Sequence, residues 1–455
     1  MTKLNPTNHT YKRNAARAWR RAAGCVLLAG LLAAGGCGPK GGGQGAGAAS
    51  ASPPPVSSPG TTASVTSTPS AASTPPAGPT PTAAAVSPTP PPDAIREKLR
   101  AMTREEKVGQ LVLVGMDGRE TNAQTKELIR TYKVGGFIFF KVNLTGTDQA
   151  LRLFTSLKDT NRASSSIPLW MSVDEEGGRV TRLPDEFEKF PSMGSLGKKN
   201  SSDLTRQVGK LIGRELAGFG LNTDFAPVLD VNSNPDNPVI GDRSFGSSAE
   251  RVSRLGVAEM KGLQSEGILS VVKHFPGHGD TSVDSHIGLP VVPYDMDRLK
   301  KLELVPFAEA VKNGADAVMV AHLLLPKLDS KHPASFSKAV ITDVLRKQLG
   351  FGGVVFTDDM TMGAVVKNYS IGQAAVQAIL AGGDIVLVGH DFEKQTTVIQ
   401  ALRKAAADGT LSEERLDESV YRILKLKAKY GVTDARPSGP DVKAINADIR
   451  KLLAP

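Results

Sequence analysis

The chain has only two cysteines, Cys25 and Cys37, among its 455 residues. Both lie near the N-terminus, and Cys25 falls in a stretch with the features of a leader that is removed. The mature chain would then keep one cysteine, which excludes an internal disulfide. The apolar stretch at 25–34 is also short, and ten residues cannot span a bilayer.

Acidic residues are absent from the first 36 positions, which hold six Lys and Arg residues. The whole chain has 55 Lys and Arg, so the remainder carries 49 basic residues against 46 Asp and Glu. That balance is ordinary, and no second basic block is present that would follow a phosphate backbone. The high net charge therefore does not indicate nucleic-acid binding.

A basic start, a short apolar core and small residues before a cysteine together indicate an export signal. The sequence Ala34-Gly35-Gly36-Cys37 resembles a bacterial lipoprotein cleavage site, although Ala34 stands where leucine is usual. We predict a signal peptide over 1–36, lipidation of Cys37 and anchoring to the extracytoplasmic face of a bacterial membrane. An ordinary signal peptidase site nearby is the alternative.

Composition divides the rest of the chain. Residues 37–92 are mostly Ala, Gly, Pro, Ser and Thr with one charge, Lys40, and too little aliphatic content to bury. Such a segment is predicted to be a disordered linker. From residue 93 the composition becomes globular. We expect one catalytic domain over 93–435 and a C-terminal tail over 436–455.

Eight short apolar runs follow, most of them separated by enough chain for a helix. They cover 108–116, 134–140, 167–174, 223–231, 268–276, 315–323, 352–360 and 382–390. Helical patterns lie at 204–219, 250–266, 296–313, 371–381 and 412–430. Near-continuous apolar strands favour a parallel sheet covered on both faces, and eight units favour an α/β fold closed as a (β/α)8 TIM barrel. An open doubly wound sheet is the alternative, but no Gly-x-Gly-x-x-Gly turn follows the first run.

Polar residues follow six of these runs at their carboxyl ends, where barrel enzymes place their chemistry. The richest stretch is 273–286, which holds three of the seven histidines together with Lys273, Asp280 and Asp284. Other runs end near Asp174, Asp230, His322, Asp358 and His390. We therefore expect an active site at this rim.

The rim residues favour acid/base chemistry on a neutral polar substrate, because no Gly-Lys-Ser/Thr phosphate loop and no Gly-x-Ser-x-Gly elbow is present. Asp358 ends a buried strand and should be rigid, as a nucleophile must be. Asp284 and His286 are two residues apart on a loop, so the carboxylate can orient the ring. A zinc site from His274, His278, His286 and Asp280 is the metal alternative, but it lacks helical ligand spacing.

At these residues the chain resembles the β-N-acetylglucosaminidase branch of glycoside hydrolase family 3 over about 95–432. Five motifs stand in order: Asp174-x-Glu176-Gly177-Gly178-Arg179, Asn232-x-Asn234-Pro235 with Gly241-x-Arg243-Ser244-Phe245, the 273–286 loop, Pro333-Ala334-Ser335-Phe336-Ser337, and Thr357-Asp358-Asp359-Met360.

The resemblance implies retention in two steps, with Asp358 as nucleophile, His286 as general acid/base and Asp284 orienting it. Asp359 competes with Asp358, but the first aspartate matches the family position. Residues implied to bind the sugar are Asp174, Arg243, Lys273 and His274, with His322 and Met362 as further pocket candidates. Asp230, Glu176, Asp280 and Arg179 are expected to hold loops.

The expected substrate is a terminal non-reducing N-acetylglucosamine of peptidoglycan fragments or chitooligosaccharides, cleaved by a monomer without metal or organic cofactor. Family 3 β-glucosidases are an alternative, but they commonly carry tryptophan after the nucleophile and take the acid/base from a second domain. Release of the sugar to phosphate, or a non-catalytic sugar-binding lipoprotein, are further alternatives. The presence of Asp358, Asp284 and His286 together argues against a non-catalytic sugar-binding protein.

Overall fold

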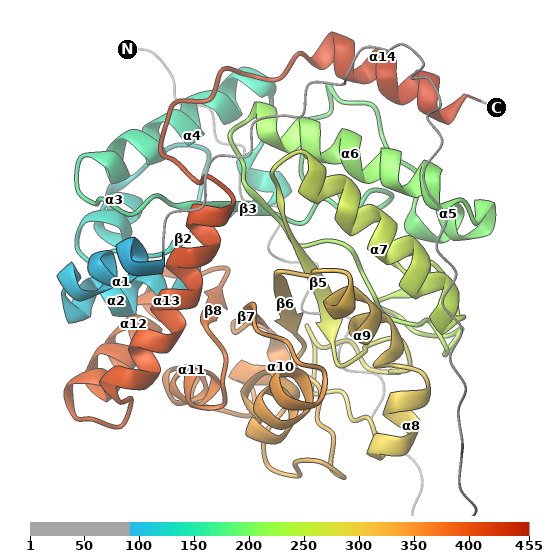
Figure 1. The fold of residues 1–455 in the computed structure, drawn as a ribbon. Helices are drawn as coiled ribbons and strands as arrows, with labels where there is room; N and C mark the ends of the chain where they lie inside the picture. The colour runs from blue at the N-terminus through green and yellow to red at the C-terminus, as the bar shows by residue number, and fades with distance from the viewer. Residues whose placement is uncertain (1–91, 455) are drawn as a thin grey trace, which may run out of the picture. The chain divides into compact units, whose positions relative to one another are not determined.

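The computed structural model describes residues 92–454, and eight parallel strands close into a barrel in sequence order. The last strand pairs with the first, with Leu113 opposite Leu387. Each of the eight predicted apolar runs contains one strand, so the predicted (β/α)8 barrel is confirmed (Figure 1). The strands are β1 Val112–Val114, β2 Gly136–Ile138, β3 Trp170–Val173, β4 Thr223–Asp224, β5 Leu269–Phe275, β6 Ala317–Val320, β7 Val354–Asp359 and β8 Ile385–Val388.

Helices follow the strands along the chain and surround the barrel (Figure 1). The α-helices are α1 Pro92–Ala101, α2 Arg104–Gln110, α3 Ala123–Arg130, α4 Thr147–Arg162, α5 Met193–Lys199, α6 Ser202–Gly218, α7 Ala249–Ser265, α8 Met296–Lys301, α9 Val305–Lys312, α10 Gly363–Val366, α11 Ile371–Leu380, α12 Phe392–Ala407, α13 Glu413–Lys429 and α14 Val442–Leu453. Shorter or wider turns are η1 Lys141–Asn143, η2 Gly241–Arg243, η3 Ala334–Phe336 and the π-helix η4 Ala339–Gln348.

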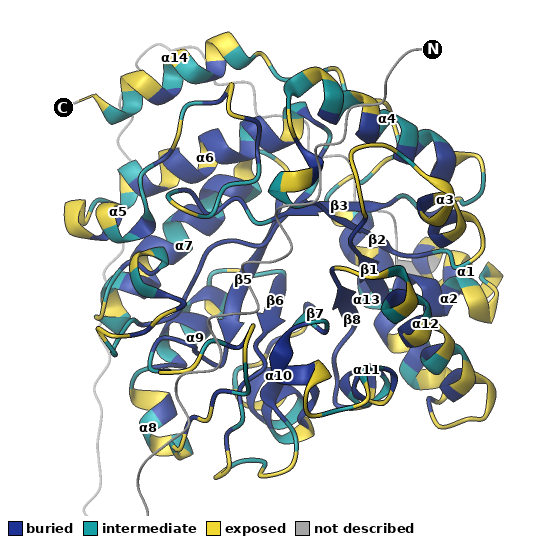
Figure 2. Cartoon of the chain, turned by 180° about the vertical axis from the view of Figure 1, so that it is seen from behind, coloured by how far each residue is buried: buried dark blue, intermediate teal, exposed yellow. Residues whose placement is uncertain are grey.

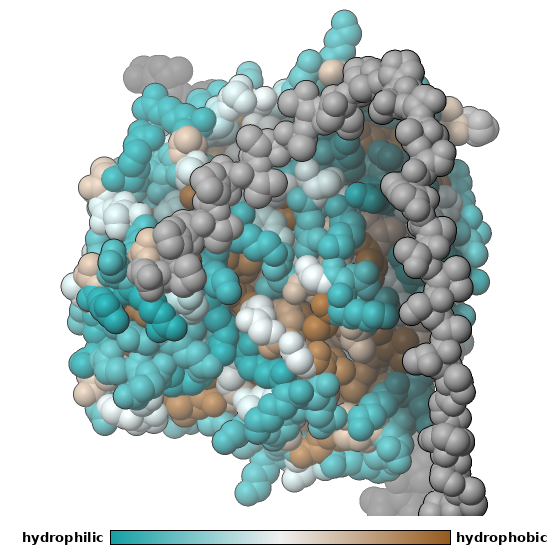
Figure 3. All heavy atoms as spheres, in the orientation of Figure 1, coloured by the Kyte–Doolittle hydropathy of each residue, from teal (hydrophilic) through white to brown (hydrophobic). Residues whose placement is uncertain are grey.

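Burial explains this arrangement. All seven residues of β5 are buried, as a strand covered by helices on one side and by the barrel interior on the other must be. The helices bury one stripe and expose the other, so strands are dark in Figure 2 and outer helix faces are light. Ser201 and Ser248 start α6 and α7 by accepting backbone N–H groups. Hydrophilic side chains cover most of the face seen in Figure 3, with apolar ones in patches.

Several boundaries differ from the sequence prediction. A capping box between Thr103 and Glu106 starts α2, so 108–110 is helical rather than the start of a strand. The predicted helix 296–313 is split into α8 and α9, because Pro306 fits only in the first turn of a helix. In the tail predicted over 436–455, α14 packs with buried Ile445 and Ile449.

The predicted signal peptide, the lipidation site Cys37 and nearly all of the predicted linker lie outside the described residues. Within 92–454, no helix is both long and apolar enough to cross a membrane.

Candidate active site

A cavity of about 480 Å³ opens at the carboxyl ends of the strands. Eight of the nine predicted catalytic and sugar-binding residues line it; they are Asp174, Arg243, Lys273, His274, Asp284, His286, Asp358 and Met362. Residues far apart in the sequence thus meet in one place, because parallel strands bring all their carboxyl ends to one rim.

One wall of this cavity is a buried ionic cluster. Lys273 extends from β5, and its Nζ lies 2.7 Å from Asp174 Oδ1 and 2.6 Å from Glu176 Oε1. Arg243 binds both oxygens of Glu176, each at 2.7 Å. Burial alone would raise the pKa of Glu176, but the charges of Arg243 and Lys273 outweigh it and hold that pKa well below its ordinary value.

The same balance acts on the other members of the cluster. Burial would raise the pKa of Asp174, but Lys273 and Arg182 lower it overall. Burial would lower the pKa of Lys273, but the two carboxylates raise it overall. All these groups are therefore charged at neutral pH, and they present fixed donors and acceptors to a polar ligand.

Asp230, fully buried after β4, holds the start of the 273–286 loop. Its Oδ1 accepts the N–H groups of His274 and His278, which confirms the expected binding of loop amides. Its Oδ2 lies 2.6 Å from His274 Nδ1. Arg243 Nη2 lies 3.3 Å from His274 Nε2 and can only donate, so Nε2 accepts and Nδ1 carries the ring hydrogen.

Asp358 and Asp359 at the end of β7 have different environments. Asp359 Oδ1 already accepts from Thr361 N, Thr361 Oγ1 and Gly389 N, each at 2.9 Å. The carboxylate of Asp358 accepts only the N–H of Asp359, at 2.8 Å, among the bonds within the described chain. Asp359 therefore braces the loop, and Asp358 is left to face the cavity.

Asp358 is ionised. Burial alone would raise its pKa, but the nearby imidazoles of His322 and His274 and the hydrogen bond from the Asp359 amide outweigh burial, so the pKa lies below its ordinary value. An ionised carboxylate on a rigid strand is the state that a nucleophile requires.

Asp284 and His286 form a pair at the mouth of the cavity. Asp284 Oδ1 lies 2.7 Å from His286 Nδ1 and 2.8 Å from the His286 amide nitrogen. Asp284 therefore fixes the ring, while 64% of the His286 side chain stays exposed. Burial alone would raise the pKa of Asp284, but the hydrogen bonds from His286 favour the charged carboxylate and lower that pKa overall.

His322 is the one predicted residue that does not line the cavity. It is fully buried behind the end of β7, where Nε2 donates to the Asp359 carbonyl at 3.0 Å. Nδ1 then accepts from the Ser335 hydroxyl at 2.6 Å. Burial lowers the pKa of His322, so the ring is neutral and supports the strand end.

The structure adds Arg182, which the sequence analysis left out. Arg182 lines the cavity, and its Nη2 lies 3.5 Å from Asp174 Oδ2. Its position in the segment that follows β3 and carries Asp174 was the available signal. Glu176, expected to hold a loop, belongs to the ionic cluster. Apolar side chains also line the cavity, namely those of Ile138, Phe140, Met319 and Leu387.

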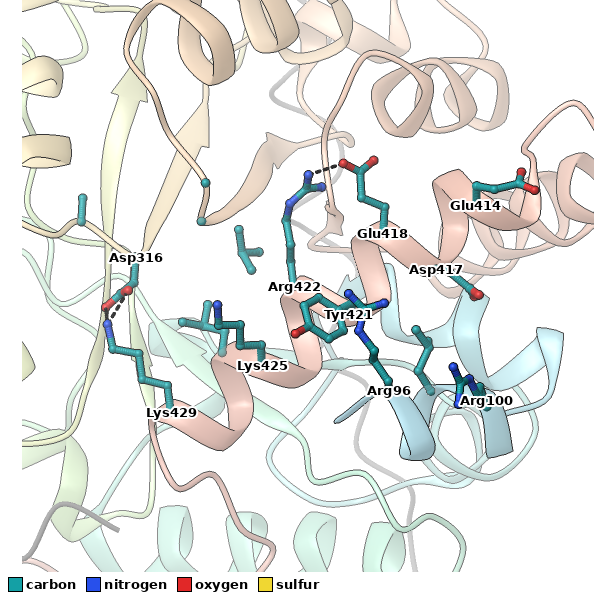
Figure 4. A pocket seen from close by; sticks show the side chains of 16 residues that line it. Arg96, Arg100, Asp316, Glu414, Asp417, Glu418, Tyr421, Arg422, Lys425 and Lys429 are labelled. Carbon is teal, nitrogen blue, oxygen red and sulfur yellow. Dashed lines mark hydrogen bonds and ion pairs between the residues drawn. The ribbon is translucent and has the colours of Figure 1, made fainter. Parts of the chain in front are cut away.

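A second cavity, of about 780 Å³, lies at the opposite end of the barrel between α1, α13 and the segments before β6 and β7. Two ion pairs lie among its charged side chains, and Figure 4 shows them: Arg422 with Glu418 and Lys429 with Asp316. Among residues 92–454, no group of three or more His, Cys, Asp or Glu could hold a metal ion. The carboxyl-end cavity, which eight of the nine predicted residues line, is the candidate active site.

Comparison with known proteins places the chain in a family. Residues 103–426 match the glycosyl hydrolase family 3 N-terminal domain. The chain belongs to glycoside hydrolase family 3. The predicted resemblance and the predicted enzyme class, a glycoside hydrolase, are thereby confirmed.

Relatives of this family 3 chain support the assignment. Beta-hexosaminidase LpqI of Mycobacterium tuberculosis is 36% identical over 334 residues, 72% of this chain and 83% of the relative. Beta-hexosaminidase A of Pseudoalteromonas piscicida is 37% identical over 335 residues, which are 69% of this chain but only 56% of that protein. A family 3 beta-N-acetylglucosaminidase from Paenibacillus sp. FPU-7 is 43% identical with a TM-score of 0.74, covering 77% of this chain and 68% of the other.

Proposed function

We propose that this family 3 chain is an exo-acting, retaining β-N-acetylhexosaminidase with Asp358 as nucleophile and His286–Asp284 as acid/base pair. The observation that carries the proposal is the shared cavity: an ionised Asp358 on a strand end, and an exposed imidazole oriented by a carboxylate at the mouth. The names of the relatives, beta-hexosaminidase and beta-N-acetylglucosaminidase, support the choice of sugar.

In the first step, Asp358 attacks the anomeric carbon and the bond to the leaving oxygen breaks. His286 donates the Nε2 proton to that oxygen while its Nδ1–H stays bonded to Asp284. In the second step, neutral His286 takes a proton from water, and the water oxygen displaces Asp358 from the sugar. The two displacements retain the anomeric configuration. In glycosidases with two catalytic carboxylates, the distance between them predicts retention or inversion. That rule does not apply to an enzyme whose acid/base is a histidine.

The ionic cluster is proposed to bind the sugar hydroxyls. Lys273, Arg243 and Arg182 offer donors, Asp174 offers an acceptor, and the ion pairs hold them in place before substrate arrives. A cup above a packed barrel accepts the end of a glycan rather than its middle, which favours exo action. The apolar lining residues suit the N-acetyl methyl group or the face of a sugar ring.

The proposed substrates are peptidoglycan fragments or chitooligosaccharides that end in N-acetylglucosamine. Their location in the cell envelope agrees with the proposed signal peptide and with lipidation at Cys37, which would attach a monomeric enzyme to a membrane through the linker. Metal and organic cofactors have no role in the proposed steps.

The test is hydrolysis of 4-nitrophenyl N-acetyl-β-glucosaminide by the purified protein, beside the matching β-glucoside. Wild type should cleave the N-acetyl substrate with and without EDTA, and Asp358→Asn should lose about 10³-fold or more in kcat, because it cannot form the glycosyl-enzyme. Preference for the glucoside would indicate a β-glucosidase. Turnover that requires phosphate would indicate a phosphorylase, and binding without turnover would indicate a sugar-binding protein.

A further inference from the structure

His278 lies beneath the loop that carries Asp284 and His286. Its ring is buried, with Nδ1 2.7 Å from Thr281 Oγ1 and Nε2 3.1 Å from Ser285 Oγ. The proposed mechanism gives His278 no role, although it lies between His274 at the end of β5 and His286 on the loop that follows.

Ser285 stands between the two members of the acid/base pair. Within the described chain, the hydrogen bonds of the Asp284 and His286 side chains join only these two residues. The backbone carbonyls of Ser285 and His286 accept N–H groups from Ala364 and Gly363, at 3.0 and 3.1 Å. The Ser285–His278 bond is thus the side-chain hydrogen bond that ties this tripeptide to the barrel.

His278 is a firm anchor for such a tie. Its N–H donates to Asp230 Oδ1 at 2.6 Å, and its carbonyl accepts from Asn237 Nδ2 at 2.9 Å. The next residue, Gly279, passes so close to the segment after β4 that an added Cβ would lie 1.9 Å from the Val231 carbonyl oxygen. Asp230 also holds His274, so one buried carboxylate fixes both the sugar-binding side and the support of the acid/base side.

The protonation state of His278 suits this contact. Burial lowers its pKa to about 4, so the ring is neutral at neutral pH. A neutral imidazole has one donor and one acceptor nitrogen, and each faces a hydroxyl that can play either part. Both ring nitrogens are therefore satisfied without a charge that would compete with His286 for Asp284.

We propose that His278 is a positioning residue that acts through Ser285 to hold the Asp284–His286 pair where His286 Nε2 can transfer its proton to the leaving oxygen. The inference rests on the proposed function of His286. It assigns the His278–Ser285 bond to the acid step, and it leaves the nucleophile and the ionic cluster unaffected. Proton transfer needs a heavy-atom distance of about 2.6–3.2 Å, so a small shift of the loop is enough to impair it.

The experiment uses N-acetyl-β-glucosaminides with a good leaving group, 2,4-dinitrophenol, and a poor one, methanol. We expect Ser285→Ala and His278→Asn to lower kcat/KM about tenfold or more on the methyl glycoside but less than about threefold on the dinitrophenyl glycoside, because only the poor leaving group needs the proton. His278→Gln should restore most of the loss, because the longer amide reaches the place of Nε2 while Asn reaches only that of Nδ1.

The matched control is His332→Asn, which alters a histidine that faces Asp329 on another loop and should leave both rates unchanged. Equal losses on both substrates, or no loss in Ser285→Ala, would overturn the inference. If His278→Asn does not fold, Ser285→Ala decides, because it removes only a hydroxyl. An identical loss of both rates in His286→Ala would overturn the proposed function itself.

Discussion

Replacement of Lys273 by methionine tests the ionic cluster most directly. The change keeps the length and apolar stem of the side chain but removes a buried charge that lies within 2.7 Å of two carboxylates. Removing one partner of a buried ion pair typically costs about 3–5 kcal/mol, because the other charge is left without compensation. Glu176 keeps Arg243, whereas Asp174 keeps only Arg182 at 3.5 Å. We expect a loss of about 4 kcal/mol at pH 7.

The pH dependence gives the sign of the effect. In the wild type the pKa values of Asp174 and Glu176 are lowered on folding, so their stabilising contribution is present above the unfolded pKa and lost as the pH falls. Without Lys273, burial dominates for Asp174 and raises its pKa. The difference in unfolding free energy between wild type and Lys273→Met should therefore be smaller at pH 4 than at pH 7, because Asp174 of the variant is protonated and uncharged at the lower pH.

The assay is urea unfolding followed by circular dichroism at pH 4, 5, 6 and 7. The double variant Asp174→Asn with Lys273→Met removes both charges and should recover part of the loss, because no unpaired carboxylate remains at that position. Lys425→Met, on the exposed face of α13, is the control and should change stability by less than about 0.5 kcal/mol. A loss below about 1 kcal/mol that does not vary with pH would refute this account of the cluster.

Three further predictions concern other buried or exposed groups. Burial raises the pKa of Glu259 on α7 from its ordinary 4.5 to about 8, so stability is complete at low pH and is lost as the pH rises through this range. Glu259→Gln should recover about 3 kcal/mol of this lost stability at pH 7, measured by urea unfolding between pH 5 and 8. A free energy of unfolding that depends on pH as in the wild type would contradict this. His286→Ala should slow hydrolysis of methyl N-acetyl-β-glucosaminide about 10²-fold or more and hydrolysis of the dinitrophenyl analogue far less. Equal losses on the two substrates would show that His286 is not the acid. Lys427→Met should lower the free energy of unfolding by about 2–4 kcal/mol, because Lys427 Nζ bonds to Gln110 Oε1, Gly135 O and Pro168 O beneath the barrel. The kcat/KM of the folded enzyme should stay the same. A large change in kcat/KM would contradict the separation of the two barrel ends.

Local patterns were sufficient for the barrel, because a parallel strand covered on both faces must be a short apolar run. These patterns did not locate the ends of the helices and strands. The run at 108–116 is apolar throughout, yet the Thr103–Glu106 capping box makes its first residues helical. The pattern at 296–313 is helical throughout, yet the break before Pro306 is a property of backbone geometry rather than of hydrophobic period.

In the candidate site, too, the sequence indicated some residues and left others to the structure. That Asp358, Asp284 and His286 lie around one cavity could be predicted from their motifs, because each lies in a short polar segment after an apolar run. Arg182 was indicated only by its place in the segment that carries Asp174, and the support from His278 was not indicated at all. Their partners, Asp174 and Ser285, are selected by how loops pass one another above the strands, and no spacing in the sequence expresses that distance.

The sequence by itself determined which residues are apolar, how often they recur and which chemical groups follow each strand, and these settle the fold class and the family. The tertiary structure decided which of those groups meet, which are buried and which carboxylate has free oxygens. Asp358 and Asp359 are adjacent and identical in kind, and the hydrogen bonds that Thr361 and Gly389 donate to Asp359 distinguish their surroundings. The reason is physical: pKa values and hydrogen bonds depend on distances through space, which the order of residues along the chain does not contain.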